Sequence, residues 1–474
     1  MSHNLKSYPE YKDTGVLCFG EVPAHWRVDR LGVIFKERGE VNWDERVTQV
    51  LSVLRDRGVI LYEQKGNIGN KRSEDITRYK IVRPDDIVVN CMNVIIGSVG
   101  LSRYTGCLSP VYYVLQARND DDSPHYFNHV FGMKPFQRSL VRLGNGILSH
   151  RMRIPMEKLK CELLPRPPIE EQRAIARFLD HYDRLTRRYI RMQRRLIDLL
   201  TEQKQTLIQQ AVTRGLDPDV PLKDSGVEWL GDVPEHWNVW TLSRLIQNIE
   251  QGWSPVAAEG AITADQWTVL TLSAVKKGEF DPDAIKPISQ SADIPDGIEV
   301  YPEDFLLTRS NTRSLVGDVC VVDRLRPRTV LCDLIYRLSI DNSKLLSRFL
   351  MYWMLSPFGR FQIEADARGS SQTMVKLSQG HIKGWRILLP PLREQALIVD
   401  YLDQISRKWK RSTTELEKQI DLIREYRTRL IADVVTGKLD VRSVPLPDLD
   451  ETGEPDDVDD LKEDLLDPEE GSDE

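Results

Sequence analysis

The side chains best suited to bind a polymer of bases and phosphates are concentrated in a few short segments of this 474-residue sequence. Arg, Lys, Asn, Gln and Ser make hydrogen bonds to base edges and phosphates. In the first half of the chain the candidates are Lys65, Asn67, Asn70, Lys71, Arg72, Asn90, Asn93, Asn145, His150, Arg151 and Arg153. In the second half they are Arg309, Asn311, Arg313, Arg324, Arg368, Ser370, Ser371 and Gln372. Any one segment is compatible with an ordinary polar turn, but their occurrence at roughly corresponding places in both halves favours contact with DNA.

Catalytic signatures are absent from the sequence. It contains no GxGxxG, no phosphate-binding GxxxxGK[ST], no HExxH and no GxSxG. The two Pro-Pro pairs, at 167–168 and 390–391, precede predicted helices and lack the flanking pattern of a DNA methyltransferase. A nuclease pattern built from Asp85, Glu202 and Lys204 would place two of its members deep in a helix, far from any strand. The chain is therefore not expected to be an enzyme by itself.

The charge of the chain is distributed unevenly. The 65 Lys and Arg against 72 Asp and Glu give a formal net charge of −7. The last 30 residues, from Pro445, hold 15 acids and one base, so the remaining 444 residues hold 64 bases and 57 acids. This pattern predicts a mildly basic body and a disordered acidic tail. We expect the tail either to discourage nonspecific DNA contact or to engage a basic partner surface.

Several classes of protein are excluded by composition. No run approaches 18 apolar residues, which argues against a membrane span. The polar first twelve residues lack the apolar stretch of a signal peptide. Six cysteines without CxxC spacing support neither a disulfide framework nor a zinc finger, and no metal site is expected. A reducing cytoplasm is the simplest location.

The chain consists of two diverged copies of one unit. Lys12–Trp26 reads KDTGVLCFGEVPAHW and Lys223–Trp237 reads KDSGVEWLGDVPEHW, nine of fifteen residues being identical at an offset of 211. PPIEEQRAIARFLD, from Pro167, matches PPLREQALIVDYLD, from Pro390, at an offset of 223. The copies therefore differ by 12 residues (223 − 211) between the two motifs. A histidine precedes the tryptophan in each first motif, which favours a repeated packing corner over an active site.

The stretches after the Pro-Pro pairs are predicted to be long helices. Apolar residues recur there at spacings of three and four, without Gly or Pro. About 45 residues make a helix about 67 Å long, whose apolar stripe needs a partner, and the other copy's helix is the obvious one. Eight arginines between Arg173 and Arg195 crowd the first helix. They fit either a solvated helix face or contact with phosphates or an acidic partner.

Between the motifs, each copy carries short β-branched and aromatic runs bounded by turn residues. Examples are DDIVVNCMNVIIGSVGLSRY, from Asp85, and DFLLTRSNTRSLVGDVCVVD, from Asp304. We therefore expect an α+β protein with two mixed α/β domains in pseudo-twofold arrangement, joined by two long antiparallel coiled-coil helices. The expected segments are domain one at 1–166, helix one at 167–215, domain two at 216–389, helix two at 390–441 and the disordered acidic tail at 442–474.

These motifs resemble the specificity subunit of type I restriction–modification enzymes. The resemblance rests on the doubled G-V-x-W-L-G-x-V-P-x-H-W motif, the doubled Pro-Pro…Glu-Gln start of a long helix, and GSVGLSRYTGCLSPVYYVL from Gly97. It spans about residues 12–441. Copy one departs from the family pattern at Leu17-Cys18-Phe19, where copy two has Glu228-Trp229-Leu230.

The resemblance implies a non-catalytic subunit that directs partner enzymes to double-stranded DNA. Each variable domain would be a target-recognition domain reading one half of a bipartite sequence, and the helices would set the spacer, on the order of one DNA turn, about 34–36 Å. Two methyltransferase subunits and two restriction subunits would bind, bringing S-adenosylmethionine, ATP and Mg²⁺, with no membrane involved. Candidate spacer and docking residues on the helices are Glu171, Gln172, Leu179, Leu196, Glu394, Gln395, Leu402 and Ile420.

Two alternatives belong to other functional classes. One is a structural coiled-coil adaptor with no DNA role. The other is a single-chain DNA methyltransferase or nuclease, which the missing motifs disfavour. DNA binding separates the first from a specificity subunit, and methylation by the purified chain with S-adenosylmethionine separates the second.

Overall fold

The computed structural model describes residues 6–55, 57–66, 71–144, 153–256, 258, 262–263, 265–289, 292–367 and 374–446. Its contacts divide the chain into two compact units. Unit 1 combines residues up to Gln193 with residues from Lys418 onward, and unit 2 comprises Arg194–Glu417. The predicted tail beyond Leu446 lies outside the described residues, as do nine DNA-binding candidates, namely Asn67, Asn70, Asn145, His150, Arg151, Arg368, Ser370, Ser371 and Gln372.

The centre of unit 1 is a four-stranded antiparallel sheet in the order β4-β11-β8-β9. These strands are β4 (Phe35–Glu37), β11 (Tyr112–Ala117), β8 (Ile87–Asn90) and β9 (Val99–Leu101). One face of the sheet packs on α2 (Pro124–Gly132) and α3 (Lys134–Ser139), and the other on the hairpin β5 (Leu51–Leu54)–β6 (Gly58–Leu61). Successive residues of one strand point to opposite faces, so the fully buried run from Ile87 to Val89 supplies both cores.

Unit 2 repeats this sheet as β16-β25-β21-β23, again antiparallel throughout. Its strands are β16 (Ile246–Gln251), β25 (Ile335–Ile340), β21 (Phe305–Thr308) and β23 (Val319–Val321). One face packs on α6 (Ser347–Leu355) and α7 (Pro357–Asp366). The opposite face has its own core with β17 (Thr268–Leu270) and β18 (Val275–Lys276). The α+β class predicted from the sequence is confirmed.

Smaller elements complete each unit. In unit 1 they are β1 (Tyr11–Asp13), β2 (Glu21–Pro23), β3 (Arg27–Arg30), α1 (Leu31–Ile34), β7 (Lys80–Val82), β10 (Gly106–Leu108), α4 (Met156–Leu159), β12 (Leu163–Arg166) and the 3-10 turns η1 (Tyr62–Lys65), η2 (Val94–Ile96) and η3 (Leu140–Leu143). In unit 2 they are β13 (Leu222–Asp224), β14 (Asp232–Pro234), β15 (Asn238–Thr241), β19 (Glu279–Phe280), β20 (Ile285–Pro287), β22 (Ser310–Asn311), β24 (Thr329–Val330), β26 (Val375–Lys376), α8 (Gln379–Gly384), β27 (Arg386–Leu389) and the turns η4 (Leu242–Arg244) and η5 (Leu272–Ala274).

The matching elements show where the copies differ in length. The first residues of β4 and β16 are 211 apart (246 − 35), those of β8 and β21 are 218 apart (305 − 87), and those of β9 and β23 are 220 apart (319 − 99). From β11 and β25 onward the offset is constant at 223, through α2 and α6 to the long helices (335 − 112, 347 − 124, 392 − 169). All 12 additional residues of copy two therefore precede β25, and the second part of each copy is one shared scaffold.

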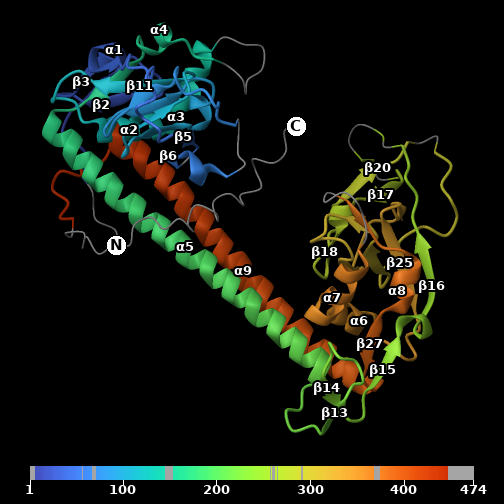
Figure 1. The fold of residues 1–474 in the computed structure, drawn as a ribbon. Coiled ribbons are helices and arrows are strands. Elements are labelled where there is room, and N and C mark those ends of the chain that lie inside the picture. Colours follow the sequence, from blue (N-terminus) through green and yellow to red (C-terminus); the bar gives the residue numbers. More distant parts are fainter. Residues whose placement is uncertain are drawn as a thin grey trace. The chain divides into compact units, whose positions relative to one another are not determined.

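The two long helices are α5 (Ile169–Arg214) and α9 (Leu392–Val435), and their prediction is confirmed. Within unit 1 they run antiparallel, because Asp183 pairs with Arg427 at 2.5 Å while the Tyr189 hydroxyl donates to Gln419 at 3.0 Å (Figure 1). Within unit 2 the Lys204 ammonium lies 4.0 Å from the centre of the Trp409 ring. None of the helices among the described residues is both long and apolar enough to cross a membrane.

Each unit is closed by the C-terminal end of one long helix. In unit 2 the end of α5 enters the core and the chain continues directly into β13 and β14. In unit 1 the end of α9 enters the core next to β1 and β2, which come from the other end of the chain. Here the amide of Asp440 donates to the Lys6 carbonyl at 2.8 Å, and the Tyr11 hydroxyl donates to the Gly437 carbonyl at 3.0 Å. Both ends of the described chain thus belong to one unit.

Candidate nucleic-acid interface

The repeated histidine–tryptophan pair is a packing corner that fastens each domain to its helix. In unit 1 the Trp26 indole donates to Glu171 at 2.9 Å, and His25 Nε2 lies 2.7 Å from the same carboxylate. In unit 2, Trp237 and His236 hold Glu394 at the same two distances, 2.9 and 2.7 Å. Trp26 and Trp237 are both fully buried. The invariant partner of this pair is therefore the glutamate of the doubled Pro-Pro…Glu-Gln motif.

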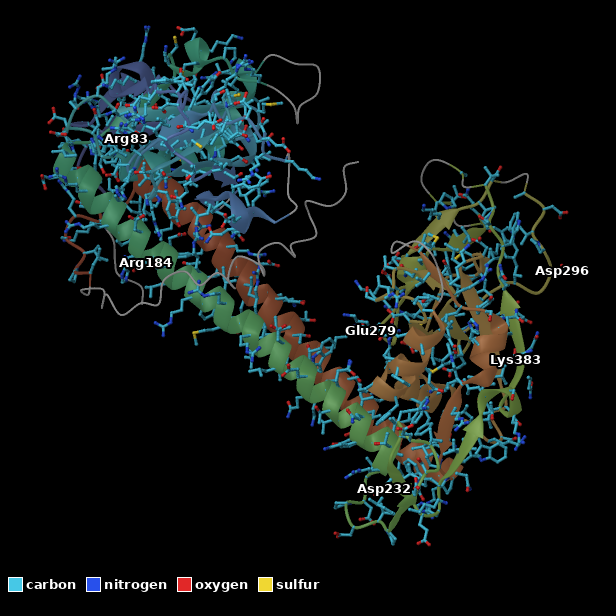
Figure 2. All side chains as sticks on the ribbon, viewed as in Figure 1. Arg83, Arg184, Asp232, Glu279, Asp296 and Lys383 are labelled. Atoms are coloured by element: carbon cyan, nitrogen blue, oxygen red, sulfur yellow. The ribbon has the colours of Figure 1, made fainter. Side chains whose placement is uncertain are left out.

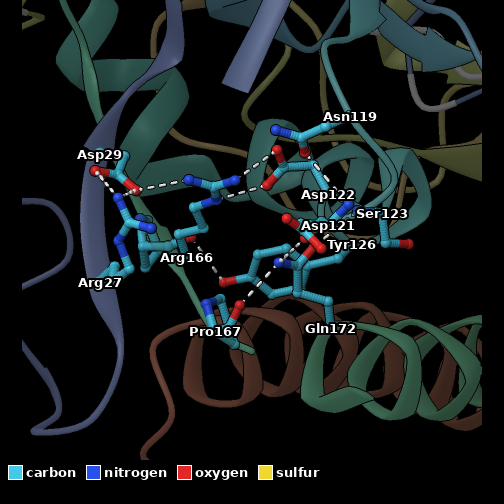
Figure 3. A network of polar contacts seen from close by, with 11 residues as sticks. Arg27, Asp29, Asn119, Asp121, Asp122, Ser123, Tyr126, Arg166, Pro167 and Gln172 are labelled. Carbon is cyan, nitrogen blue, oxygen red and sulfur yellow. Dashed lines mark hydrogen bonds and ion pairs between the residues drawn. The ribbon is translucent and has the colours of Figure 1, made fainter. Parts of the chain in front are cut away.

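The glutamine of the same motif is fully hydrogen-bonded inside each unit. The Gln172 Oε1 accepts from the amide of Ser123 at 2.8 Å, and its Nε2 donates to the carbonyls of Pro167 at 2.8 Å and Asp121 at 3.2 Å (Figure 3). Gln395 repeats all three bonds with Leu346, Pro390 and Lys344 at 2.8–2.9 Å. Because buried amides need all their partners, this glutamine fixes the first turn of the long helix against the start of α2 or α6.

A buried ion-pair cluster strengthens this joint in unit 1 alone. The Arg166 guanidinium donates two bonds to Asp122, at 2.6 and 2.8 Å, and one to Asp29 at 3.0 Å (Figure 3). The Asp122 side chain is fully buried, and this burial raises the pKa of its carboxyl. The equivalent positions of unit 2, at offsets of 223, 223 and 211, hold Leu389, Leu345 and Trp240.

The helix candidates occupy two kinds of position. Buried inside their units are Glu171, Gln172, Leu179, Gln395, Leu402 and Ile420. Glu394 keeps a partly exposed side chain, and Leu196 is 43% exposed. Contact with a partner subunit at any of these residues stays a prediction, whereas attachment of domain to helix is the role that their hydrogen bonds and packing show.

In unit 1, the described DNA-binding candidates gather at one end of the sheet. Asn90 is the last residue of β8, and its Oδ1 accepts from the Met92 amide at 3.1 Å, which folds the loop towards Asn93. The amide of Ile154 donates to the Cys91 carbonyl at 2.9 Å, so the neighbouring Arg153 joins the same loop. Two segments more than 50 residues apart along the sequence, 90–93 and 153, are thereby brought together.

The segment 71–72 is linked to this end through tyrosines. The amide of Arg72 donates to the Tyr62 hydroxyl at 2.8 Å, and the amide of Ser73 donates to the Tyr79 hydroxyl at 3.0 Å. The next residue, Lys80, donates to the carbonyl of Tyr112, which pairs with Asn90 in the sheet. Lys71 and Arg72 are exposed, whereas Lys65 is 6% exposed and lies 4.9 Å from the Tyr62 ring. Lys65 therefore points inward.

Unit 2 places its candidates at the equivalent end. Arg309 follows β21, and the strand β22 behind it pairs with β26, so that Ser310 faces Lys376 and Asn311 faces Val375. Arg313 is exposed on the loop that leads to β23. The segment 309–311 thus corresponds to 91–93, at an offset of 218, and the segment that ends at β26 corresponds to the one that ends at Arg153, at an offset of 223 (376 − 153).

The third pair of segments does not correspond, contrary to the expectation from sequence. Lys65–Arg72 lies between β6 and β7, before the strand that matches β21, whereas Arg324 lies after β23. The exposed Arg324 is followed by Arg328, which donates to the carbonyl of Asp265 at 2.6 Å. The copies differ in length between their first and second sheet strands, so distance along the chain is a poor guide to structural equivalence there.

A repeated tyrosine at this end escaped the sequence analysis. Tyr113 of β11 and Tyr336 of β25 are related by the offset of 223, and only 7% and 3% of their surfaces are exposed. Arg153 hydrogen-bonds to the Tyr113 hydroxyl, which raises the pKa of the arginine, and the Arg309 guanidinium lies 5.7 Å from the Tyr336 ring centre. Extending the 223-residue alignment backwards from the Pro-Pro motif would have paired these tyrosines.

The side chains at these two sheet ends are of types that bind a ligand through hydrogen bonds and charge. Arginines, asparagines and serines dominate both, and burial raises the pKa of the Cys91 thiol, which keeps it uncharged. Within the described residues, no three His, Cys, Asp or Glu side chains are placed to hold a metal ion. The geometry therefore suits recognition of a polar polymer.

Comparisons with known proteins agree with this arrangement. A model of the type I restriction modification DNA specificity domain matches residues 300–422. The MjaVIII specificity subunit of Methanocaldococcus jannaschii is 22% identical over 439 residues, covering 89% of this chain and 95% of the relative. The EcoEI specificity subunit of Escherichia coli is 23% identical over 209 residues, covering 44% of this chain and 35% of the relative, so the chain spans about a third of that subunit's length. A solved structure described as the basis of complex assembly and conformational transition of the type I R-M system has a TM-score of 0.64 at 17% identity, covering 88% and 99%.

Proposed function

We propose that this chain, which is similar in sequence to specificity subunits of type I restriction enzymes, recognises a bipartite DNA sequence for such an enzyme. The observation that carries the proposal is the pair of equivalent polar loop clusters, each at the same end of the same four-stranded sheet. Each unit reads one half-site. The loop sequences differ between the units, so the two half-sites differ as well.

The proposed partner proteins are inferred from the similarity to specificity subunits, and not from contacts within this chain. We propose two methyltransferase subunits and two restriction subunits, which bring S-adenosylmethionine, ATP and Mg²⁺, with the complex acting in the cytoplasm. In this scheme the chain performs no chemistry, and α5 and α9 set the spacer and dock partners. Exposed apolar side chains along α5 support docking there, namely Leu185, Tyr189, Met192, Leu196 and Leu199. Arginines such as Arg184, which is exposed on α5, would add contact with phosphate or an acidic partner (Figure 2).

Methylome sequencing tests this function directly. The chain is co-expressed with a type I methyltransferase subunit from the same genome in a host that lacks DNA methylation, and the host DNA is sequenced by a single-molecule method. We expect one bipartite methylated motif that requires both proteins. Methylation by the chain without the partner would instead make it an enzyme.

Binding measurements separate the proposed role from that of a structural adaptor. A specificity subunit should shift a duplex carrying the motif more strongly than an unrelated duplex, with an affinity that falls as salt rises. The measurement is made with and without the methyltransferase subunit. An adaptor would assemble with its partner and leave both duplexes unbound.

A further inference from the structure

We propose that Arg309 reads a guanine in the half-site recognised by unit 2. The inference deepens the proposed function and rests on it, because it names the residue and the base. It arises from one side chain whose backbone is held firmly while its guanidinium lacks the partners that other internal arginines have.

The backbone of Arg309 is fixed by two neighbouring segments. Its amide donates to the Leu334 carbonyl at 2.8 Å, and its carbonyl accepts from the Leu377 amide at 2.9 Å. The following residue, Ser310, pairs with β26 and donates its hydroxyl to the Val375 carbonyl at 3.2 Å. A side chain on such a support starts from a defined position, which lowers the entropy lost on binding.

The guanidinium itself is held by a ring and is incompletely hydrogen-bonded. It lies 5.7 Å from the centre of the buried Tyr336 ring, and its Nη1 is 3.4 Å from the Asp333 carbonyl. Its Nε is buried without a hydrogen-bond partner, and it forms no ion pair among the described residues. Arg337, one strand position from Tyr336, shows the contrast, since it pairs with both Glu250 and Asp304.

These properties suit a guanidinium that hydrogen-bonds to the edge of a base with two adjacent acceptors. The Nε donor is buried and cannot reach a ligand, so contact with a base comes from the Nη1 and Nη2 groups. These two groups offer parallel N–H donors, and in the major groove guanine presents two adjacent acceptors, O6 and N7. Adenine replaces one of them with a donor. The residue type therefore selects guanine over the other bases.

Unit 1 supports the assignment, because its equivalent tyrosine contacts an arginine from a different loop. Tyr113 occupies the position of Tyr336, but the residue that matches Arg309, at the 218 offset, is the buried Cys91. Two cations meet Tyr113: the Lys80 ammonium lies 5.4 Å from the ring centre, and Arg153, from the second loop of the cluster, interacts with the hydroxyl. A shared aromatic support with an arginine from a different loop would place the two guanidinium groups differently, which fits half-sites of different sequence.

Substitution of Arg309 tests the inference in the assembled enzyme. The chain with Arg309→Ala is co-expressed with its methyltransferase subunit, and the methylated motif is compared with that of the unsubstituted chain. We expect one guanine position, in one half-site, to lose its preference by about 10-fold or more. The other half-site, read by unit 1 in the same molecules, is the internal control.

Matched variants separate base recognition from charge and from folding. Arg309→Lys keeps the charge but not the paired donors, so the same position should loosen. Tyr336→Leu removes the ring beside the guanidinium, so it should loosen the position that Arg309→Ala loosens. Arg313→Ala should lower methylation evenly across sequences, as expected for a phosphate contact.

One set of outcomes would overturn the role of Arg309, and a different outcome would overturn the proposed function. A bipartite motif that is unchanged in Arg309→Ala and Arg309→Lys overturns the role of Arg309 while leaving the proposed function intact. If Arg309→Ala gives no methylation, the Lys variant decides, and an unchanged motif in that variant again overturns the inference. If the unsubstituted chain directs no motif, the proposed function itself fails.

Discussion

Around Arg166, where the domain of unit 1 meets its long helix, the two units fill the equivalent space with different side chains. In unit 1 the guanidinium is surrounded by Asp122 and Asp29, whose charges are removed from water. In unit 2, Leu389, Leu345 and Trp240 fill the same place without any charge. A buried ion pair loses much of its attraction to desolvation, so an apolar replacement of similar volume is often as stable. Unit 2 carries such an apolar replacement at the equivalent positions of the same chain.

We therefore expect opposite results from breaking the cluster and from replacing it. Asp122→Ala should lower the free energy of unfolding of unit 1 by about 3–5 kcal/mol, because it removes two of the three carboxylate hydrogen bonds of the buried Arg166 guanidinium. The triple variant Asp29→Trp, Asp122→Leu, Arg166→Leu should be neutral or more stable than the natural chain. Denaturant unfolding measures both variants. If the triple variant loses as much stability as the single one, the cluster is not interchangeable with the apolar form.

A similar exchange occurs between helices, where α2 meets α5 and α6 meets α9. In unit 1, His129 Nε2 lies 2.8 Å from Asp180, and His125 lies 3.8 Å from Asp180 and 3.3 Å from Asp85. At the matching positions of unit 2, Arg348 and Tyr352 both bond to Asp403, and Arg348 also pairs with Asp323. The contact in unit 2 keeps its charges near neutral pH, whereas the one in unit 1 includes a histidine that titrates there.

The stability of unit 1 should depend on pH through this contact. The nearby Asp180 carboxylate raises the pKa of His125, so the contact contributes fully below about 6.5, the ordinary value for histidine, and weakens as pH rises through the higher folded value. Burial opposes ionisation of Asp180, but His125 and His129 together lower its pKa, so the contact also weakens in strong acid.

The substitution His125→Arg, which installs the residue of unit 2, should flatten the pH dependence. We expect the unfolding midpoint of the natural chain to fall between about pH 6 and pH 8 and that of the variant to fall less. The companion substitution Arg348→His should introduce the same dependence in unit 2. Parallel curves for the natural chain and His125→Arg would show that this histidine does not control the joint.

The elements were predictable to different degrees. The long helices followed from apolar spacing and from the absence of Gly and Pro, and both are present as α5 and α9. The strand-rich parts followed from β-branched runs, but the sheet order depends on contacts between distant segments that no local pattern contains. For the same reason the roles of Glu171 and Gln172 could not be seen, since partners such as Trp26 and Ser123 lie 145 and 49 residues away.

The helices make a prediction of their own, because α5 begins in unit 1 and ends in unit 2. Inserting four residues near its middle lengthens it by about 6 Å, close to two base pairs of duplex. We expect the methylated motif to keep both half-sites and to change only the number of bases between them. Altered half-sites, measured by methylome sequencing, would refute the view that the helices set the spacer.

At the scale of the molecule, the uneven charge bears on how DNA is held. Residues 1–444 carry 64 bases against 57 acids, which is a small excess for a protein that would grip a duplex alone. A modest excess fits a subunit that shares the DNA with partners. In the proposed complex, affinity from phosphates would come from all subunits, and selectivity would depend on a few side chains such as Arg309 and Arg153.

The acidic tail gives the last prediction. Val444 and Leu446 pack against the core of unit 1, so a truncation that preserves the fold must end after Leu446. The segment removed carries 15 acids and one base. Its negative charge should repel phosphates, so truncation should strengthen binding to a nonspecific duplex several-fold at low salt, with little change at high salt.

A full-length variant separates the charge of the tail from its length. In this variant each tail aspartate is replaced by asparagine and each glutamate by glutamine, and it should bind nonspecific DNA like the truncated chain. The test measures duplex binding across a salt series, together with assembly with the methyltransferase subunit. If both variants bind DNA like the natural chain but fail to assemble, the tail contacts a basic surface of the partner instead of shielding the chain from DNA.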